Sequence, residues 1–187
     1  SQDGVMAEYY IVNDVEMNTA HIPDDVSLEN ALMVSDMMTT GFHGVELADV
    51  QFGDTVVVIG TGPVGLMAVV AAKLRGAGRI IAVGSRAKCR ELAIHYGASN
   101  VVNYKDGDIY AQIMELTGGK RVDRTVIAGG GTEQLPIAYK LTRPGGGIGD
   151  LVAADTPPKI EIDTLDFNRF VAHHKLSGGL CPGGRRR

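Results

Sequence analysis

The sequence predicts an α/β fold built on a doubly wound parallel sheet of six strands. Short runs rich in β-branched residues alternate with longer helical segments from residue 55 onward, as in successive βαβ units. The first run, residues 55–59, ends in closely spaced glycines and leads into an apolar helix. A length of 187 residues allows one complete domain and part of another. We therefore expect one such domain and a remnant.

The glycines after the first run follow the G-x-G-x-x-G spacing. Gly60 would allow a tight turn, Gly62 the close approach of a pyrophosphate, and Gly65 the close packing of helix on strand. Backbone N–H groups at the helix start would face the phosphates. A plain glycine-rich turn is the alternative, but the position between a buried strand and a long helix favours a dinucleotide site of the Rossmann type. The expected cofactor contacts in this turn are Gly60, Gly62, Pro63, Val64 and Gly65.

The stretch before the first strand shows two kinds of pattern. Residues 4–12 have the composition of an extended segment, which is too short to form a sheet by itself. Ser27 is a candidate N-cap of a helix with Leu28 and Leu32 on its apolar face. A second helical stretch is expected over residues 36–48.

The remaining elements alternate as expected of parallel βαβ units. Gly97 is a good C-cap for one helix, and Pro136 lies within another, which must begin later or bend there. Helices are expected over residues 66–75, 88–96, 108–116 and 132–141. Strands after the first are expected over residues 79–84, 100–104, 123–128, 148–152 and 175–180. Six strands is the number in two mononucleotide-binding halves.

The end of the second strand indicates which dinucleotide binds. An NAD site usually has an Asp or Glu about 20 residues beyond the glycines, which holds the ribose 2′-hydroxyl. Here the chain has Gly84, Ser85 and Arg86 and no acidic residue. A carboxylate would repel a 2′-phosphate, whereas a hydroxyl and a guanidinium donate hydrogen bonds to it. The sequence therefore favours NADP over the alternative of a surface turn. Tyr104, at the end of the third strand, lies near the adenine or belongs to the core or rim.

Composition argues against several classes of partner. The net charge is −4 and the one basic run is residues 185–187, so nucleic acid is not expected as a partner. No apolar run approaches the roughly 20 residues of a membrane span, so no membrane contact is expected. Cys89 and Cys181 lack the spacing of a zinc ribbon or a disulfide framework, and two free thiols fit a reducing cytoplasm.

Six stretches resemble a known family: residues 36–44, 62–68, 74–86, 102–107, 127–130 and 178–184. Together they are similar to NADP-dependent secondary alcohol dehydrogenases, which are zinc-containing medium-chain dehydrogenase/reductases. The resemblance covers nearly the whole chain, and the third stretch is far more specific than any glycine spacing. It implies an oxidoreductase that transfers a hydride between NADP(H) and a small secondary alcohol or ketone, with zinc as the Lewis acid.

The resemblance also implies roles for individual residues. Asp36 matches a catalytic zinc ligand, although from the sequence alone it could equally be a helix N-cap. Thr40 matches a threonine beside the nicotinamide, and Ala128, the last residue of the expected fourth strand, lies in a matched stretch and is expected to contact the cofactor. The residues that match the group for the 2′-phosphate and adenine are Gly84, Ser85, Arg86 and Tyr104. No catalytic residue is assigned, and His43 is expected to be structural.

The chain also departs from the family. The family's other zinc ligands, a cysteine and a histidine followed by a glutamate, have no counterpart here, and neither does the final helix. Residues 148–154 and 167–174, on the nicotinamide side, diverge. We therefore expect a fragment in which residues 1–35 are a remnant of the catalytic domain with its connecting segment. Residues 36–187 would be the NADP-binding domain, truncated at its C-terminus, which alone would bind cofactor but barely catalyse.

The family forms tetramers in which the cofactor domains join edge to edge. The resemblance thus implies a homo-oligomer, with residues 175–180 as the contacting edge strand. A stand-alone NADP-binding module without catalysis is the alternative function. The missing ligands favour that alternative, and the intact stretch over residues 36–44 disfavours it.

Overall fold

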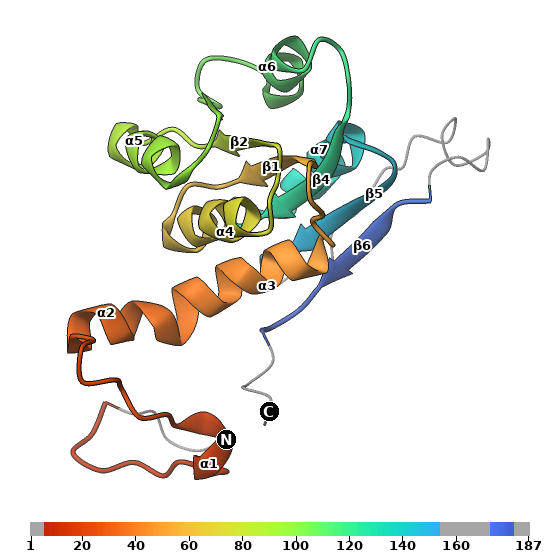
Figure 1. Cartoon of the computed structure of the whole chain (residues 1–187). Helices are drawn as coiled ribbons and strands as arrows, with labels where there is room; N and C mark the ends of the chain where they lie inside the picture. Colours follow the sequence, from red (N-terminus) through yellow and green to blue (C-terminus); the bar gives the residue numbers. More distant parts are fainter. Residues whose placement is uncertain (1–5, 154–172, 182–187) are drawn as a thin grey trace.

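The computed structural model describes residues 6–153 and 173–181, and the structural statements below concern these residues. A six-stranded sheet in the order β3-β2-β1-β4-β5-β6 forms its centre, and all neighbouring strands are parallel (Figure 1). The strands are β1 (Thr55–Ile59), β2 (Arg79–Val83), β3 (Asn100–Val102), β4 (Val122–Ile127), β5 (Thr142–Asp150) and β6 (Lys175–Gly178). Because this order places the first strand between two βαβ halves, the predicted doubly wound α/β fold is confirmed.

Helices cover both faces of the sheet. Four of them follow strands: α4 (Pro63–Leu74), α5 (Ala87–Tyr96), α6 (Ile109–Leu116) and α7 (Gln134–Leu141). Val56 and Val58 of β1 pack in a buried cluster with residues of α4 and α5. Val57 and Ile59 belong to a second cluster with residues of α6 and α7. Since successive strand residues point to opposite faces, β1 is buried on both sides, and Figure 1 shows α4 and α6 on opposite sides of the sheet.

Several element boundaries differ from the expected ones. Helix α4 begins at Pro63 rather than at residue 66, because proline is well suited to the first helical position. Helix α7 begins at Gln134, which places Pro136 in the first turn, where its missing N–H leaves no bond unmade. Strand β5 begins at Thr142, well before residue 148, and a shift in its pairing register with β4 accommodates the glycines between.

The N-terminal region was predicted less well. Residues 6–12 form no strand, because no neighbouring strand pairs with them, and a short helix, α1 (Val15–Asn18), follows unpredicted. The next helical elements are α2 (Leu28–Met33), the π-helical turn η1 (Val34–Met38) and α3 (Thr39–Leu47). The Oγ of Ser27 accepts a hydrogen bond from the backbone N–H of Asn30 at 3.3 Å, as expected of an N-cap.

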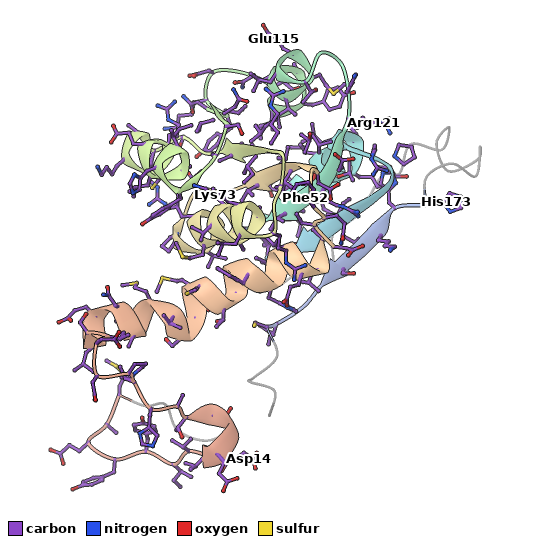
Figure 2. The ribbon with its side chains drawn as sticks, viewed as in Figure 1. Asp14, Phe52, Lys73, Glu115, Arg121 and His173 are labelled. Atoms are coloured by element: carbon purple, nitrogen blue, oxygen red, sulfur yellow. The ribbon has the colours of Figure 1, made fainter. Side chains whose placement is uncertain are left out.

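Elements α2, η1 and α3 form one uninterrupted helical run rather than two helices. Asp36 lies inside this run, so the N-cap interpretation of Asp36 is wrong. The division between residues 35 and 36 also falls inside the run, and it remains a prediction. The N-terminal segment that includes Asp14 lies apart from the sheet (Figure 2). No helix in the described part of the chain is long and apolar enough to cross a membrane.

A half-buried carboxylate, that of Asp123, links three strands at their amino ends. Asp123 of β4 accepts a hydrogen bond from the backbone N–H of Thr55, the first residue of β1, at 2.8 Å. It also accepts one from Nε of Arg143, at the start of β5, at 2.5 Å. Burial by itself would raise the pKa of Asp123, but these hydrogen bonds and the charges of Arg143 and Arg124 outweigh it and lower the pKa. The ionised form of Asp123 therefore stabilises the folded state.

This pKa shift predicts a pH dependence of stability. Asp123→Asn should lower the free energy of unfolding by about 1–2 kcal/mol near neutral pH, because a charged acceptor is lost. Since the pKa of Asp123 is lower in the folded than in the unfolded chain, this stabilisation is complete above about pH 4 and is lost as the pH falls through the folded-state value. Urea unfolding of both proteins between about pH 7 and about pH 3 measures the difference.

Glu91→Gln provides the control for this comparison, because Glu91 makes an exposed ion pair with Lys88 on α5. It should change stability little at either pH. A difference between Asp123→Asn and the unaltered chain that stays constant down to acid pH would contradict the prediction.

Candidate functional site

An open cavity of about 700 Å³ lies at the carboxyl ends of the central strands. It is bounded by the loops that follow β1, β2 and β4 and by the starts of α6 and α7. In open parallel sheets, ligands bind outside the carboxyl ends of the strands, where the strand order reverses. The expected site residues that line it are Gly60, Gly62, Gly84, Ser85, Arg86, Tyr104 and Ala128.

The glycine turn after β1 is shaped by two close backbone contacts. Gly60 has a φ of +105°, and a Cβ built on it would lie 2.9 Å from the carbonyl carbon of Ala128. A Cβ on Gly65 would collide with the carbonyl oxygen of Gly60. The start of α4 can therefore lie directly against the end of β1 only with glycine at position 65.

Gly62 is surrounded differently from its neighbours. A Cβ on Gly62 would meet only one Nη of Arg86, at an ordinary distance of 3.8 Å. Since Gly62 lines the cavity and its missing side chain points toward the guanidinium, the fold itself does not require glycine there. The open space beside this backbone is where a pyrophosphate would approach it. Pro63, Val64 and Gly65 lie behind the turn, in the first turn of α4, and do not line the cavity.

Three side chains gather where β2 and β3 end. The hydroxyl of Ser85 donates a hydrogen bond to the phenolic oxygen of Tyr104 at 2.8 Å. Arg86 is exposed and has its backbone at the N-cap of α5, and its side chain makes no capping hydrogen bond. Gly84 precedes them, and a Cβ there would collide with the side chain of Thr61. A hydroxyl pair and an unengaged guanidinium thus line one end of the cavity, beside the glycine turn.

The starts of α6 and α7 contribute lining residues that were not among the expected site residues, although Gly107 and Gly130 lie in the matched stretches. These are Gly107, Asp108, Ile109, Gly130, Glu133, Gln134 and Ile137. Hydrogen bonds from its own backbone N–H and from that of Gly131 lower the pKa of Glu133. The general rule that loops after parallel strands face the carboxyl edge would have pointed to these two loops.

Asp36 and Thr40 lie outside the cavity, on the helical run that ends in α3. The Thr40 hydroxyl donates a hydrogen bond to Oδ1 of Asp36 at 2.9 Å. The next residue, Gly41, lets α3 touch α4, since a Cβ there would lie 2.6 Å from the carbonyl oxygen of Val64. The Asp36–Thr40 pair is therefore held close to the start of α4, behind the glycine turn.

Within residues 6–153 and 173–181, Asp36 does not have the companions that a metal centre needs. Within the described residues, no group of three or more His, Cys, Asp and Glu side chains could hold a metal ion. A catalytic zinc ion usually has three protein ligands. His43, on the same helical run, lies 3.7 Å from Glu46, consistent with the structural role expected of it.

Comparison with known proteins gives a consistent set of relatives. The family model described as zinc-binding dehydrogenase matches residues 63–177. The NADP-dependent isopropanol dehydrogenase of Thermoanaerobacter brockii is 54% identical over 186 residues, which is 100% of this chain and 53% of that protein. The protein of the same name from Entamoeba histolytica is 48% identical over 186 residues, 100% of this chain and 51% of that one.

Solved structures agree with the sequence relatives. An alcohol dehydrogenase from a Thermus species superposes with a TM-score of 0.79 at 27% identity, covering 89% of this chain and 47% of the other. The chain therefore spans about half the length of the curated relatives and solved structures that it matches.

The contrast between two glycines gives a test of the site. Gly65→Ala should destabilise the fold by about 1–3 kcal/mol, because the added methyl group collides with the Gly60 carbonyl. Gly62→Ala should leave stability within about 1 kcal/mol, because nothing lies close to the added methyl group. It should nevertheless weaken NADP binding about tenfold, since the methyl group occupies the space beside the turn. Thermal unfolding and calorimetric titration of both variants measure these effects, and full NADP affinity in Gly62→Ala would exclude this turn as the phosphate site.

Proposed function

The chain belongs to the zinc-binding dehydrogenase family, and we propose that it is the cofactor-binding part of an oxidoreductase that transfers a hydride between NADP(H) and a small secondary alcohol or ketone. The observation that supports this most directly is one cavity that joins a glycine turn to Ser85 and Arg86, with no carboxylate at the end of β2. The isopropanol dehydrogenases that resemble the chain over its whole length use NADP, as their names state.

The residues of the cavity fit NADP. In our proposal the turn at Gly60 and Gly62 holds the pyrophosphate, with the positive end of the α4 dipole toward it. Arg86 would bind the 2′-phosphate through its planar guanidinium, and the hydroxyls of Ser85 and Tyr104, already paired with each other, would supply further donors. Gly84 and Ala128 would allow the cofactor to lie close to the ends of β2 and β4.

We propose that the nicotinamide, the reacting end of the cofactor, lies beside α3. Thr40 would lie beside the nicotinamide, with its hydroxyl oriented by the hydrogen bond that it donates to Asp36. Oxidation of a secondary alcohol moves a hydride to the nicotinamide and releases the hydroxyl proton, so a fixed position of the ring is the contribution needed from this side. Gly65 and its neighbours Pro63 and Val64 would act by holding the turn rather than by lining the cavity.

Zinc is proposed only for the complete enzyme. The described residues do not assemble a zinc site, so Asp36 is proposed as one ligand whose partners come from elsewhere in the complete protein. The alternative function, an NADP-binding module without catalysis, is favoured by that same lack of companion ligands. The Asp36–Thr40 pair favours the enzyme, because a binding module has no evident need for it.

The proposed setting is the cytoplasm, and the proposed partners are the alcohol or ketone substrate and further copies of the chain. Cys89 and Cys181 lack the sequence spacing of a disulfide framework, which fits a reducing compartment. In the complete enzyme we propose a tetramer. Strand β6 forms the edge of the sheet, and an edge strand offers unpaired backbone groups to a second copy.

Cofactor preference tests the proposed function. Arg86→Ala should weaken NADP binding by about 1–3 kcal/mol, the usual scale for a hydrogen bond to a charged group, and should change NAD binding little. Calorimetric titration with both cofactors measures the two affinities. Arg75→Ala is the matched control, because Arg75 pairs with Glu46 and does not line the cavity. Equal losses for NADP and NAD in Arg86→Ala would show that Arg86 does not recognise a 2′-phosphate.

Assembly and metal content give a second test. We expect the isolated chain to self-associate through β6 and to hold no stoichiometric zinc. Leu176→Asp should weaken association, because it places a charge on an edge strand where the leucine is half exposed. Sedimentation of both proteins measures their association, and metal analysis measures their zinc content. A strictly monomeric unaltered chain would contradict the assembly, and zinc held by this chain alone would contradict the role of Asp36 as one ligand among others.

A further inference from the structure

The loop between β3 and α6, residues 103–107, carries Tyr104 to the cavity. Tyr104 lines the cavity and is half exposed. Its phenolic oxygen accepts a hydrogen bond from the hydroxyl of Ser85 at 2.8 Å, which leaves the phenolic O–H as a donor. The loop belongs to no strand or helix, so its backbone conformation decides where that hydroxyl lies. The position of this donor therefore depends on what holds the loop.

Asn103 shapes the loop from within. Its carbonyl oxygen accepts a hydrogen bond from the backbone N–H of Asp106 at 3.0 Å, which closes a four-residue turn with Tyr104 in the second position. The side chain of Asn103 adds two more bonds. Its Oδ1 accepts from the backbone N–H of Lys105 at 3.1 Å, and its Nδ2 donates to Oδ1 of Asp106 at 2.7 Å. These bonds fix the shape of the turn but not its position relative to the sheet.

Gln112 ties this turn to α6. Its Nε2 donates hydrogen bonds to the carbonyl oxygens of Asn103 and Gly107, each at 3.1 Å. These two residues are the first and the last of the loop, so one amide group holds both ends. The amide can make this pair of bonds in only one orientation, because its nitrogen carries two N–H groups and its oxygen carries none.

The helix that carries Gln112 is itself fixed to the sheet. The next residue, Ile113, is fully buried in the cluster that includes residues of β1, β2 and β4. Asp108 caps the helix by accepting a hydrogen bond from the backbone N–H of Ala111 at 2.8 Å. Gln112 is not among the residues that line the cavity. It therefore acts on a ligand of the cavity through the loop that it holds.

We propose that Gln112 is a positioning residue for NADP recognition, and that it acts by fixing the hydroxyl of Tyr104 at the end of the cavity that Arg86 lines. This inference rests on the proposed function, in which the hydroxyls of Ser85 and Tyr104 donate hydrogen bonds to the 2′-phosphate. NAD has a hydroxyl in place of that phosphate, so it gains much less from a donor held there. Loss of Gln112 therefore lowers the preference for NADP over NAD rather than the affinity for both.

The test removes the two N–H donors and keeps the length of the side chain. In calorimetric titration of the full chain, Gln112→Met should lose about fivefold in NADP affinity, on the scale of one weakened hydrogen bond to a charged group. It should keep NAD affinity within about twofold. Its melting temperature should stay within about 3 °C, because residue 112 is partly exposed. Should the methionine variant fail to fold, Gln112→Ala gives the same comparison, because alanine has the highest helix propensity.

A double-mutant cycle tests whether Gln112 acts through Tyr104. Tyr104→Ala should lose about tenfold in NADP affinity, and adding Gln112→Met to it should then change that affinity by less than about twofold. Gln51→Met is the matched control, because Nε2 of Gln51 also donates to two oxygens, both of Asp49, and the residue does not line the cavity. It should change neither affinity.

An unchanged preference for NADP in Gln112→Met overturns the inference, and so do equal losses for NADP and NAD. An undiminished effect of Gln112→Met in the Tyr104→Ala chain also overturns it, because the loop would then act on the cofactor through other atoms. If the unaltered chain binds NADP no more tightly than NAD, the proposed function fails instead.

Discussion

The contact between Gly65 and the carbonyl oxygen of Gly60 is the constraint on which the rest of the structure depends. It allows the first turn of α4 to lie against the end of β1 with no side chain between them. A second contact of the same kind, from Gly41 to Val64, places α3 directly on α4. At these two points, strand and helix, and helix and helix, are in direct backbone contact. Because no side chain can adjust at these points, the loop that borders the cavity has one position relative to the sheet.

The amino and carboxyl ends of the strands differ in how their charged groups are paired. At the amino edge, charges are paired: Arg124 is only 8% exposed and lies 2.8 Å from Asp54, and Lys175 reaches Asp49 at 3.7 Å. These ion pairs link residues near the ends of α3, β4 and β6, so the charges at the amino ends of the strands are paired. At the carboxyl edge, charged and polar groups such as Arg86 face open space instead. Ligands of open parallel sheets bind outside the carboxyl ends of the strands, on loops that a rigid scaffold positions.

Much of this fold could be predicted from the sequence because the signals are local. The β-branched run before Gly60 and the alternation of apolar runs with helical segments depend only on neighbouring residues, and they predicted all six strands. The start of β5 was missed because glycines 145–147 conceal a strand that pairs through a register shift. Residues 6–12 have the composition of an extended segment but pair with no strand in the described part of the chain, because pairing depends on a partner that local composition does not reveal.

The residues of the site also differ in whether the local sequence could predict them. Ser85 and Arg86 could be singled out because they stand at a set distance after the glycines. Glu133 and Gln134 could not, because their relation to the cavity arises only when α7 is folded back beside β4. The hydrogen bond between Ser85 and Tyr104 likewise joins residues on two strands, and no spacing in the sequence indicates it.

The π-helical turn η1 gives the helical run from Leu28 to Leu47 two differently directed faces. An extra residue in one turn rotates everything after it, so the apolar residues of α2 and those of α3 do not form one continuous stripe. Val45 is fully buried against the sheet, whereas Leu28 and Leu32 are 73% and 62% exposed. No loop separates the two ends. The run is therefore one continuous helical backbone, and Asp36 lies in the π-helical turn at which its two faces change direction, one turn before Thr40.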